Sequence, residues 1–149
     1  YPDGTFLPDK EVTRAEFATL VAKALKLEAA DAEFEDVNDE WFASFVGAAA
    51  KAGIIVGSDG NFRPNDTITR QEMAVIIVKA YEYLEKTATE SELSFSDNET
   101  IADWAKPFVA KAVGAGLISG MGDNMFVPEG DATRAQAAVI INRALDYLD

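Results

Sequence analysis

The sequence contains neither cysteine nor histidine. The chain can therefore form no disulfide, no thiolate or imidazole metal site, and no nucleophile of the Cys–His or Ser–His kind. It also lacks an apolar run of ~18 residues, the length that a transmembrane helix requires. We therefore predict no membrane-spanning segment.

Basic residues are scarce: 13 lysines and arginines stand against 26 aspartates and glutamates, which gives a formal net charge of −13. A chain with this charge is repelled by nucleic acids and by anionic membrane surfaces, so we expect no nucleic-acid partner. Hydrophobic residues make up 48% of the 149 positions, which suffices for a buried core. The length suits one domain or a compact set of small repeats.

Arginine is rarer still, and three of the five arginines hold one position of a repeated pentapeptide. The pentapeptide reads VTRAE at residues 12–16, ITRQE at 68–72 and ATRAQ at 132–136. Such self-similarity at several places in a short chain indicates an internally repeated fold.

The sequence around the pentapeptides repeats as well. The segment 34–84 aligns with 95–148, whereas the opening of the chain matches only the second half of this unit. We therefore predict a partial first repeat over 1–27, a second repeat over 34–84 and a third over 95–149. Together they should form one compact domain.

Each complete repeat reads as a shorter helix, a glycine-containing loop and a longer helix. Apolar residues on the longer helices recur with the spacing of one buried helical face. The three stripes are Phe17, Leu20, Val21, Ala24 and Leu25; Met73, Ile76, Ile77, Ala80, Tyr81 and Leu84; and Ala137, Ile140, Ile141, Ala144, Leu145 and Leu148. Three such helices should meet around a shared core, so we predict an all-α domain with an approximate threefold arrangement.

Short polar residues and glycines mark the ends of the shorter helices. We expect these helices to end at glycine, near Gly53 and Gly116. The candidate residues for capping their starts are Asp36 or Asn38 in the second repeat and Asp97 or Thr100 in the third.

The threonine and the glutamate of each pentapeptide predict a capping box at the start of the longer helix. The threonine hydroxyl accepts a backbone N–H of the first turn, and the acid reaches back to the threonine N–H. Each cap is worth roughly 1 kcal/mol. The three pairs are Thr13 with Glu16, Thr69 with Glu72, and Thr133 with Gln136, an allowed variant.

The capping boxes do not explain the arginine. A cation in the first turn of a helix faces the positive end of the helix dipole, which costs ~0.3–1 kcal/mol at an exposed site. One interpretation is a structural ion pair, in which the arginine of one repeat locks onto its neighbour. The other is an anion site, in which the arginine and free N–H groups at the helix start bind a carboxylate or phosphate.

The loop before each pentapeptide carries an aspartate, a residue that tolerates positive φ, a phenylalanine and a proline. We expect the phenylalanines to fill the core and the prolines to stiffen the approach to the helix. These residues are Asp3, Asp59 and Asp123; Phe6, Phe62 and Phe126; and Pro8, Pro64 and Pro128. The loops do not fit the EF-hand template, so we predict no metal site and no cofactor.

Trp41 and Trp104 hold matching places near the starts of the shorter helices. We favour core packing for both, although a tryptophan at a groove edge can also stack on a sugar ring. Gly57 and Gly120 either let a ligand approach the backbone closely or only end the segment that links the shorter helix to the turn.

Taken together, these residues resemble the S-layer homology repeat. The shared features are a Phe-x-Asp start, the tryptophan, a Gly-x-x-x-Gly segment, an Asp-Gly-x-Phe-x-Pro turn and the Ile-Thr-Arg-x-Glu box. The resemblance implies a three-pronged domain around a central bundle of three long helices. It also implies an extracellular module at the bacterial cell wall that anchors its parent protein non-covalently. The implied partner is an anionic secondary cell-wall polysaccharide, typically one bearing pyruvylated N-acetylmannosamine, bound in grooves between the prongs.

Carried over residue by residue, the resemblance implies carboxylate clamps at the three box arginines and groove-lining roles for six other residues. The clamps are Arg14, Arg70 and Arg134, and the groove residues are Trp41, Trp104, Gly57, Gly120, Asp59 and Asp123. The chain departs from the family pattern in the missing front half of the first repeat, in Gln136, and in the turn at Asn124. We therefore expect the grooves to differ in affinity.

Two other functions remain open on the sequence alone. The first is a helical assembly module of a surface-layer protein, in which the arginines lock the repeats together and no glycan binds; self-association through the parent protein belongs here. The second is a glycan hydrolase, but no spacing among the 26 acids singles out an acid/base pair. We therefore predict that the chain is not an enzyme.

Overall fold

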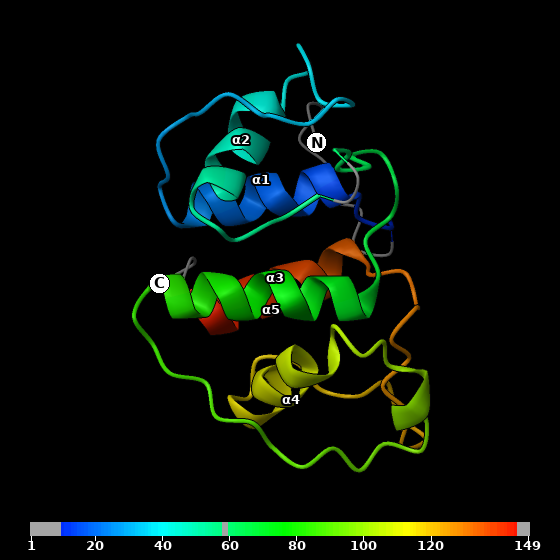
Figure 1. The fold of residues 1–149 in the computed structure, drawn as a ribbon. Helices are drawn as coiled ribbons and strands as arrows, with labels where there is room; N and C mark the ends of the chain where they lie inside the picture. Colours follow the sequence, from blue (N-terminus) through cyan, green and yellow to red (C-terminus); the bar gives the residue numbers. More distant parts are fainter. Residues whose placement is uncertain (1–9, 58–59, 146–149) are drawn as a thin grey trace.

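The structure, a computed structural model, describes residues 10–57 and 60–145. Within these ranges the chain forms α-helices joined by long loops (Figure 1). The elements are α1 (Arg14–Ala24), α2 (Ala43–Lys51), α3 (Arg70–Tyr83), the 3₁₀ helix η1 (Asn98–Thr100), α4 (Lys106–Gly114) and α5 (Arg134–Leu145). Extended pairing in the described residues is limited to isolated bridges, so the all-α prediction is confirmed.

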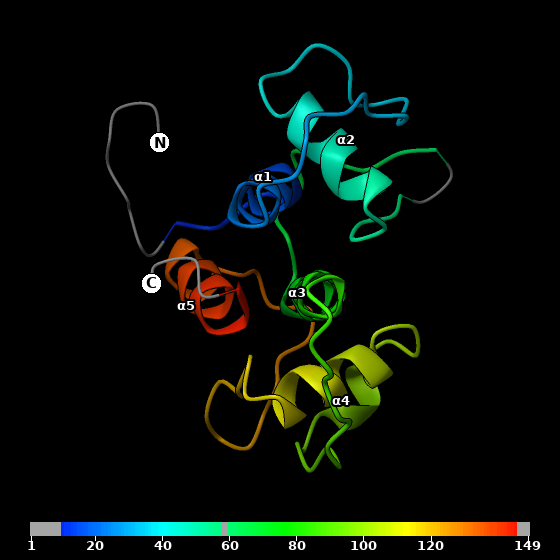
Figure 2. The same ribbon diagram turned by 90° about the vertical axis from the view of Figure 1, so that its left-hand side faces the viewer.

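The three longer helices, α1, α3 and α5, contact one another. Figure 2 views them nearly end-on and shows them at the corners of a triangle. Their apolar stripes fill its centre: Phe17, Met73 and Ile77 are fully buried, as the helical spacing predicts. The stripe of α3 ends at Leu84, which is exposed, and Leu148 lies outside the described residues.

The shorter helices pack around this bundle: α2 lies on α1 and α4 lies on α3 (Figures 1 and 2). Each shorter helix thus packs on the longer helix that precedes it in the chain. Gly53 and Gly116 follow the ends of α2 and α4 with φ values of 78° and 74°, which confirms the predicted glycine ends. Two such peripheral helices are present in the described residues, and the three-pronged arrangement stays a prediction.

The expectation that Asp36 or Asn38 and Asp97 or Thr100 cap the shorter helices was wrong. The chain turns once more before α2 and α4 begin, so the residues at their N-caps are Phe42 and Ala105, and neither makes a side-chain capping bond. None of the four candidate caps lies at the start of α2 or α4.

Instead, Asp36 clamps a distant loop. Its two carboxylate oxygens accept the N–H groups of Phe62 and Arg63, both at 2.8 Å. Asp97 accepts the N–H groups of the matching residues 126 and 127 in the same way, also at 2.8 Å. Each aspartate therefore fixes the loop that leads into the next longer helix.

A closed ring of backbone hydrogen bonds joins the segments that precede the longer helices. The N–H of Val12 donates to Ala132 O at 3.0 Å, the N–H of Ala132 to Ile68 O at 3.0 Å, and the N–H of Ile68 to Val12 O at 2.9 Å. All three residues are buried. The ring needs all three segments at once, which ties the starts of α1, α3 and α5 to one another.

The phenylalanines of the loops fill the core as predicted. Phe62 and Phe126 are each 0% exposed. The ring of Phe34 lies 5.4 Å from that of Phe62, and the ring of Phe95 lies 5.5 Å from that of Phe126. Phe6 and Pro8 lie outside the described residues, whereas Pro64 and Pro128 are buried.

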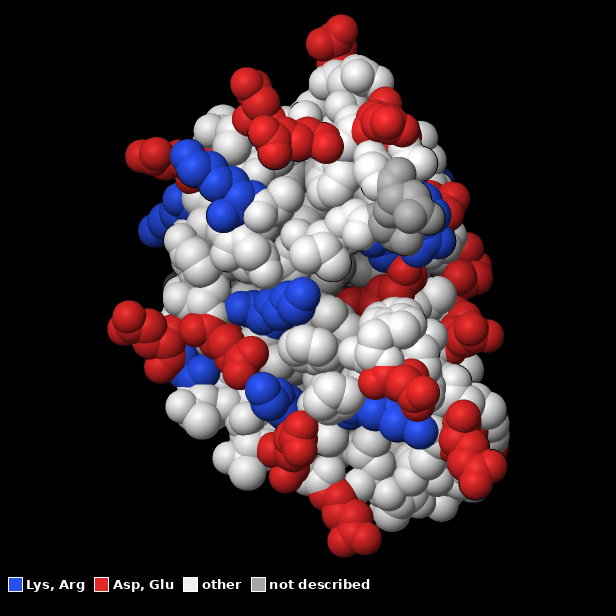
Figure 3. Space-filling view, viewed as in Figure 1, with Lys and Arg blue, Asp and Glu red and all other residues white. Residues whose placement is uncertain are grey.

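Figure 3 shows the distribution of charged side chains over one face of the molecule. On this face, lysine and arginine side chains lie from the upper left to the lower middle, interspersed with acidic side chains. In the described part of the chain, no helix is both long enough and apolar enough to cross a membrane.

Candidate functional site: two grooves beside the longer helices

The three predicted capping boxes are present at the starts of the longer helices. Reciprocal bonds between the threonine and the third helical residue occur at Thr13 with Glu16 and at Thr69 with Glu72. Gln136 completes the third capping box in place of an acid. The N–H of Thr133 donates to the side-chain oxygen of Gln136 at 3.0 Å, and the N–H of Gln136 donates to Thr133 Oγ1 at 3.2 Å.

The idea that these helix starts offer free N–H groups to an anion was wrong. The N–H of Arg14 donates to Asp66 O at 2.8 Å and the N–H of Ala15 to Pro64 O at 3.0 Å. At α3 the N–H groups of Arg70 and Gln71 are used in the same way. Carbonyl groups of the neighbouring loop thus occupy the positions that an anion would take.

Arg14 locks its repeat onto the following one. Its Nε donates to Phe62 O at 2.9 Å, its guanidinium lies over the Phe62 ring, and Nη1 forms an ion pair with Glu72. The residue is only 7% exposed. Burial lowers the pKa of Arg14, and the charge of Glu72 acts in the opposite direction, so the pair keeps a buried cation ionised.

Arg70 repeats this contact without a carboxylate. Its Nε donates to Phe126 O at 2.8 Å, Nη2 donates to Ser119 O at 2.6 Å, and the guanidinium lies over the Phe126 ring. Burial lowers the pKa of Arg70, while Asp97 acts to raise it. Among the described residues, no carboxylate forms an ion pair with Arg70.

Arg134 closes the cycle at the start of α5. Its Nη1 lies 3.6 Å from Glu16 Oε2, the acid of the first capping box. Arg14 and Arg134 therefore each pair with the box acid of another repeat. These two ion pairs are the contacts that the structural interpretation predicts, in which the arginine of one repeat locks onto its neighbour.

Core packing of the tryptophans was the wrong interpretation. Trp41 is 65% exposed and Trp104 is 56% exposed, whereas the residue that follows each of them, Phe42 or Ala105, is buried in the core. A large aromatic side chain left in solvent is available to a ligand.

A groove runs along α3 between the two peripheral helices, with a cavity volume of about 520 Å³. We call it the α3 groove. Its walls come from the segment after α2, from the outer face of α3 and from the start of α4. Its lining residues are Arg14, Ile54, Ile55, Val56, Gly57, Asn61, Arg63, Glu72, Val75, Ile76, Lys79, Trp104 and Phe108.

The α3 groove combines an apolar floor with charges at both ends. At one end Glu72 is held by Arg14 and by Arg63, whose Nη2 lies 2.9 Å from Glu72 Oε2. At the other end the Lys79 ammonium lies 5.5 Å from the centre of the Phe108 ring, with the exposed Trp104 also on the wall. Cation, aromatic face and apolar surface together suit an acidic sugar.

A second, smaller groove of about 250 Å³ lies along α5. We call it the α5 groove. Its lining residues are Arg70, Ile118, Ser119, Gly120, Met121, Ala135, Gln136, Val139, Ile140 and Arg143. Like the α3 groove, it has an apolar floor and a box arginine, but among the described residues no aromatic side chain lines it.

The structure thus divides the predicted site residues. The α3 groove contains Arg14, Gly57 and Trp104, and the α5 groove contains Arg70 and Gly120. Neither contains Arg134, Trp41 or Asp123, and Asp59 lies outside the described residues. Asp123 sits exposed in a turn, with a φ of 53°.

The two groove glycines are explained by packing inside the chain. A Cβ on Gly57 would lie 2.5 Å from the Phe34 ring, and one on Gly120 would lie 2.7 Å from the Phe95 ring. The space beside each glycine is filled by an aromatic ring of its own repeat. The missing side chain therefore allows the loop to close on that ring.

Sequence reasoning missed Lys79, Arg63 and Arg143. Lys79 and Arg143 follow the box arginines of their own helices by nine residues, and each lies on the groove-lining face of α3 or α5. That spacing was visible in the alignment of the repeats. Nothing local marks Arg63 as a groove residue, because its contact with Glu72 crosses from loop to helix.

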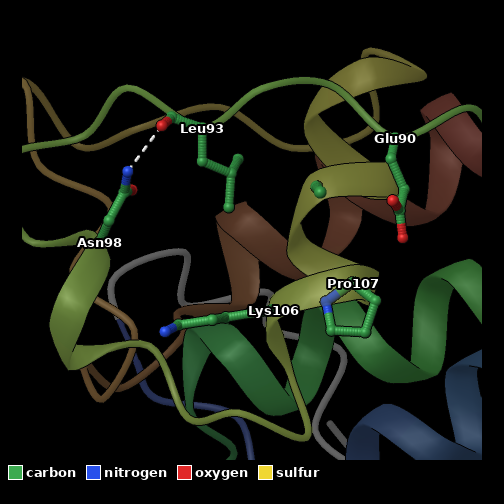
Figure 4. A pocket seen from close by; sticks show the side chains of 6 residues that line it. Glu90, Leu93, Asn98, Lys106 and Pro107 are labelled. Carbon is green, nitrogen blue, oxygen red and sulfur yellow. Dashed lines mark hydrogen bonds between the residues drawn. The ribbon is translucent and has the colours of Figure 1, made fainter.

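A third hollow lies away from both grooves, on the outer side of α4 (Figure 4). Figure 4 shows Lys106 and Pro107 at the start of α4 facing the connector that carries Glu90 and Leu93. Asn98 donates to Leu93 O at 2.6 Å and so fixes the connector. None of the predicted site residues that the structure describes lines this hollow. In the described residues, no cluster of acids is suited to hold a metal ion.

The S-layer homology domain family matches residues 1–18, 33–74 and 94–138. The chain belongs to the S-layer homology domain family. This membership makes it a cell-surface anchoring module with a cell-wall-associated location, and the family is not a catalytic one.

Individual relatives carry the same module within much longer proteins. The chain is 48% identical over 149 residues to "Exoglucanase XynX" of Acetivibrio thermocellus. The alignment covers 97% of this chain and 14% of that protein. It is 39% identical over 153 residues to "Surface-layer 125 kDa protein" of Lysinibacillus sphaericus, covering 99% of this chain and 13% of that protein.

A third relative is "S-layer protein sap" of Bacillus anthracis, 38% identical over 141 residues, which covers 93% of this chain and 17% of that protein. The chain thus spans less than a fifth of each of these three relatives. S-layer homology domains bind cell-wall polymers in general. The bounds predicted above for the three repeats stay a prediction.

Proposed function

We propose that this module anchors its parent protein by binding an anionic secondary cell-wall polysaccharide, pyruvylated on an amino sugar, in the grooves along α3 and α5. The observation that carries the proposal is the α3 groove, which places an exposed tryptophan and a lysine over an apolar floor. A sugar ring stacks on such an indole, and its acidic substituent meets the ammonium.

Charge explains why the contacts must be local. The chain carries a net charge of −13, so an anionic polymer is repelled at long range. Binding then depends on cations held at fixed positions inside a groove, where burial strengthens each contact. Lys79, Arg63 and the edge of Arg14 supply these in the α3 groove.

An assembly module without a glycan ligand is the second candidate, and a specific observation favours it. Arg14 and Arg134 are engaged by Glu72 and Glu16 within the chain, so their placement is explained without any ligand. The exposed tryptophans and Lys79 are not explained in that way. Under either of these two functions the module performs no catalysis.

Trp104→Ala and Lys79→Ala test the proposal, because neither residue belongs to the core or to the arginine locks. Each variant should weaken binding to a purified pyruvylated wall polysaccharide by about tenfold, or ~1.4 kcal/mol, measured by calorimetric titration. Urea unfolding should change little. Trp41→Ala is the matched control, since Trp41 is also exposed but lines neither groove.

Equal binding by the parent protein and both groove variants would contradict the proposal. Absence of binding by the parent protein, combined with self-association in sedimentation, would support the assembly module instead.

A further inference from the structure

Four consecutive exposed residues precede α2, and we call them the α2 tip: Asn38, Asp39, Glu40 and Trp41. The Trp41 ring lies edge-on against the buried Phe42 ring, with 5.4 Å between the ring centres. The N–H of Asn38 donates to the Glu40 carboxylate at 3.0 Å. The tip therefore presents an indole and two carboxylates to solvent on a braced turn.

The α2 tip has no partner within the described part of its own chain. Trp41 lines neither groove, and Asp39 and Glu40 form no ion pair with any described residue. The matching segment before α4 differs, because Trp104 lies on the wall of the α3 groove and Ala102 stands in place of Asp39. The exposure of Trp41 beside two acids is thus left without an explanation inside the molecule.

The α5 groove offers what the α2 tip lacks. Its charged lining residues are Arg70 and Arg143, and among the described residues no acid and no aromatic side chain lines it. Arg143 is exposed and forms no ion pair with a described residue. Met121 and Val139 are 51% and 46% exposed on the walls. The groove is therefore complementary to the tip in charge and in apolar surface.

The tip and the groove belong to elements that do not touch. α2 packs on α1, and α2 makes no contact with α5. Figure 2 shows the two helices on different sides of the bundle. The tip of one chain therefore meets the α5 groove of another chain. Because the two surfaces differ, such a contact is head-to-tail, and each copy uses its tip toward one neighbour and its groove toward the next.

We propose that the α5 groove of one copy of this chain receives the α2 tip of a second copy. The indole of Trp41 packs against Met121 and Val139, and the carboxylates of the tip face Arg143. An aromatic side chain in a pocket commonly dominates a protein interface, and complementary charge around it selects the partner. The inference does not depend on the proposed function, because no glycan takes part in the contact.

The contact is small, since a groove of about 250 Å³ accepts little more than one side chain. Small interfaces are weak and transient, and two copies with a net charge of −13 each repel one another at long range. Association should therefore require a high concentration, a condition that is met where many copies are anchored on one surface. Polymer and second copy exclude each other in the α5 groove, whereas the α3 groove is not involved.

Sedimentation velocity at rising protein concentration measures the contact. The parent chain should form oligomers that extend beyond a dimer, because the contact is head-to-tail. Trp41→Ala and Arg143→Asp should each weaken association by about tenfold or more. Asp103→Arg is the matched control: it reverses an exposed acid beside Trp104 and should leave association unchanged.

An exchange of charges tests the pairing itself. Asp39→Arg should weaken association, and adding Arg143→Asp to it should restore part of the loss, because the two charges are again opposite. The chain has two tryptophans, so Trp104→Phe leaves Trp41 to report alone. Its emission should move to shorter wavelength as the concentration rises, and this shift should disappear when Arg143→Asp is added.

A chain that stays monomeric at every concentration would overturn the inference, and so would association that Trp41→Ala leaves unchanged. If fragments of a pyruvylated wall polysaccharide shift the Met121 methyl signal in the NMR spectrum of such a monomer, the groove belongs to the polymer. The inference then fails while the proposed function stands.

Discussion

At the scale of single residues, the arginines and aspartates of this chain act as fasteners between segments far apart in sequence. Asp36 orients the loop at Phe62, and the carbonyl of Phe62 in turn accepts Arg14 Nε. Asp97 and Arg70 are coupled through Phe126 in the same way. A carboxylate, a backbone loop and a guanidinium thus form one connected unit at each of these junctions.

Removing Arg14 should therefore be costly for stability. Arg14→Ala leaves Glu72 at 14% side-chain exposure with Arg63 as its remaining cation, so we expect a loss of about 3–5 kcal/mol in the free energy of unfolding. Arg143→Ala is the control, because this exposed arginine should change stability by no more than ~0.5 kcal/mol. Urea denaturation of both variants is the measurement, and similar midpoints would refute the role of Arg14 as a lock.

Asp36 and Asp97 should make the fold sensitive to acid. Burial acts to raise the pKa of each, but the backbone N–H donors and the nearby arginine, Arg14 or Arg70, together outweigh burial and hold the pKa below the ordinary value. Each ionised carboxylate thus contributes stability above about pH 4, the ordinary pKa of aspartate, and that contribution is lost as the pH falls toward the lowered folded-state pKa.

The double variant Asp36→Asn, Asp97→Asn should lose this dependence. At neutral pH we expect it to be less stable than the parent protein by about 1–3 kcal/mol per site. Thermal unfolding from about pH 6 to pH 2.5 should show the two proteins converging as the pH falls. Parallel curves would show that these carboxylates do not carry the acid sensitivity.

At the scale of elements, connectors cross the shorter helices at close range. The backbone before α2 passes over Gly47, and the backbone before α4 passes over Gly114, each with a carbonyl oxygen 2.1 Å from where a Cβ would stand. Ser91 N–H donates to Ala110 O at 3.0 Å along the same crossing. The connectors are therefore packed parts of the fold, although their composition is that of surface linkers.

Gly114→Ala should displace the connector from α4. The added methyl group would meet Thr89 O, so we expect a loss of about 1–3 kcal/mol in the free energy of unfolding. Lys51 holds the matching position at the end of α2 and is exposed. Lys51→Ala should therefore leave the free energy of unfolding nearly unchanged. Urea unfolding of both variants tests this, and an unchanged midpoint for Gly114→Ala would mean that the connector moves aside without cost.

At the scale of the whole molecule, the ring of Val12, Ile68 and Ala132 makes the three longer helices interdependent. Each of the three hydrogen bonds joins a different pair of segments, so releasing one segment breaks two bonds. The arginine locks run around the same circle, from α1 to α3 and from α5 to α1. We therefore expect the domain to unfold as one cooperative unit.

Amide hydrogen exchange can test that cooperativity. The three ring amides should exchange only through global unfolding, with equal protection that matches the free energy from urea denaturation. Amides of the connector near Glu90 should exchange faster. Distinctly lower protection at any one ring amide would show that its segment opens independently.

The sequence by itself determined the local structure: the capping boxes, the apolar stripes of the longer helices and the glycine ends of the shorter ones depend on neighbours within a few residues. It also indicated the family, because several motifs recur at fixed spacing. Only the tertiary structure decided where Arg14, Asp36 and Trp104 lie, since Arg14 and Asp36 contact a loop far away in the sequence and Trp104 is exposed beside the α3 groove. The helix starts looked open to an anion because sequence cannot show that a carbonyl from the next loop lies there first. Lys79, likewise, became a groove residue only once α4 packed beside α3.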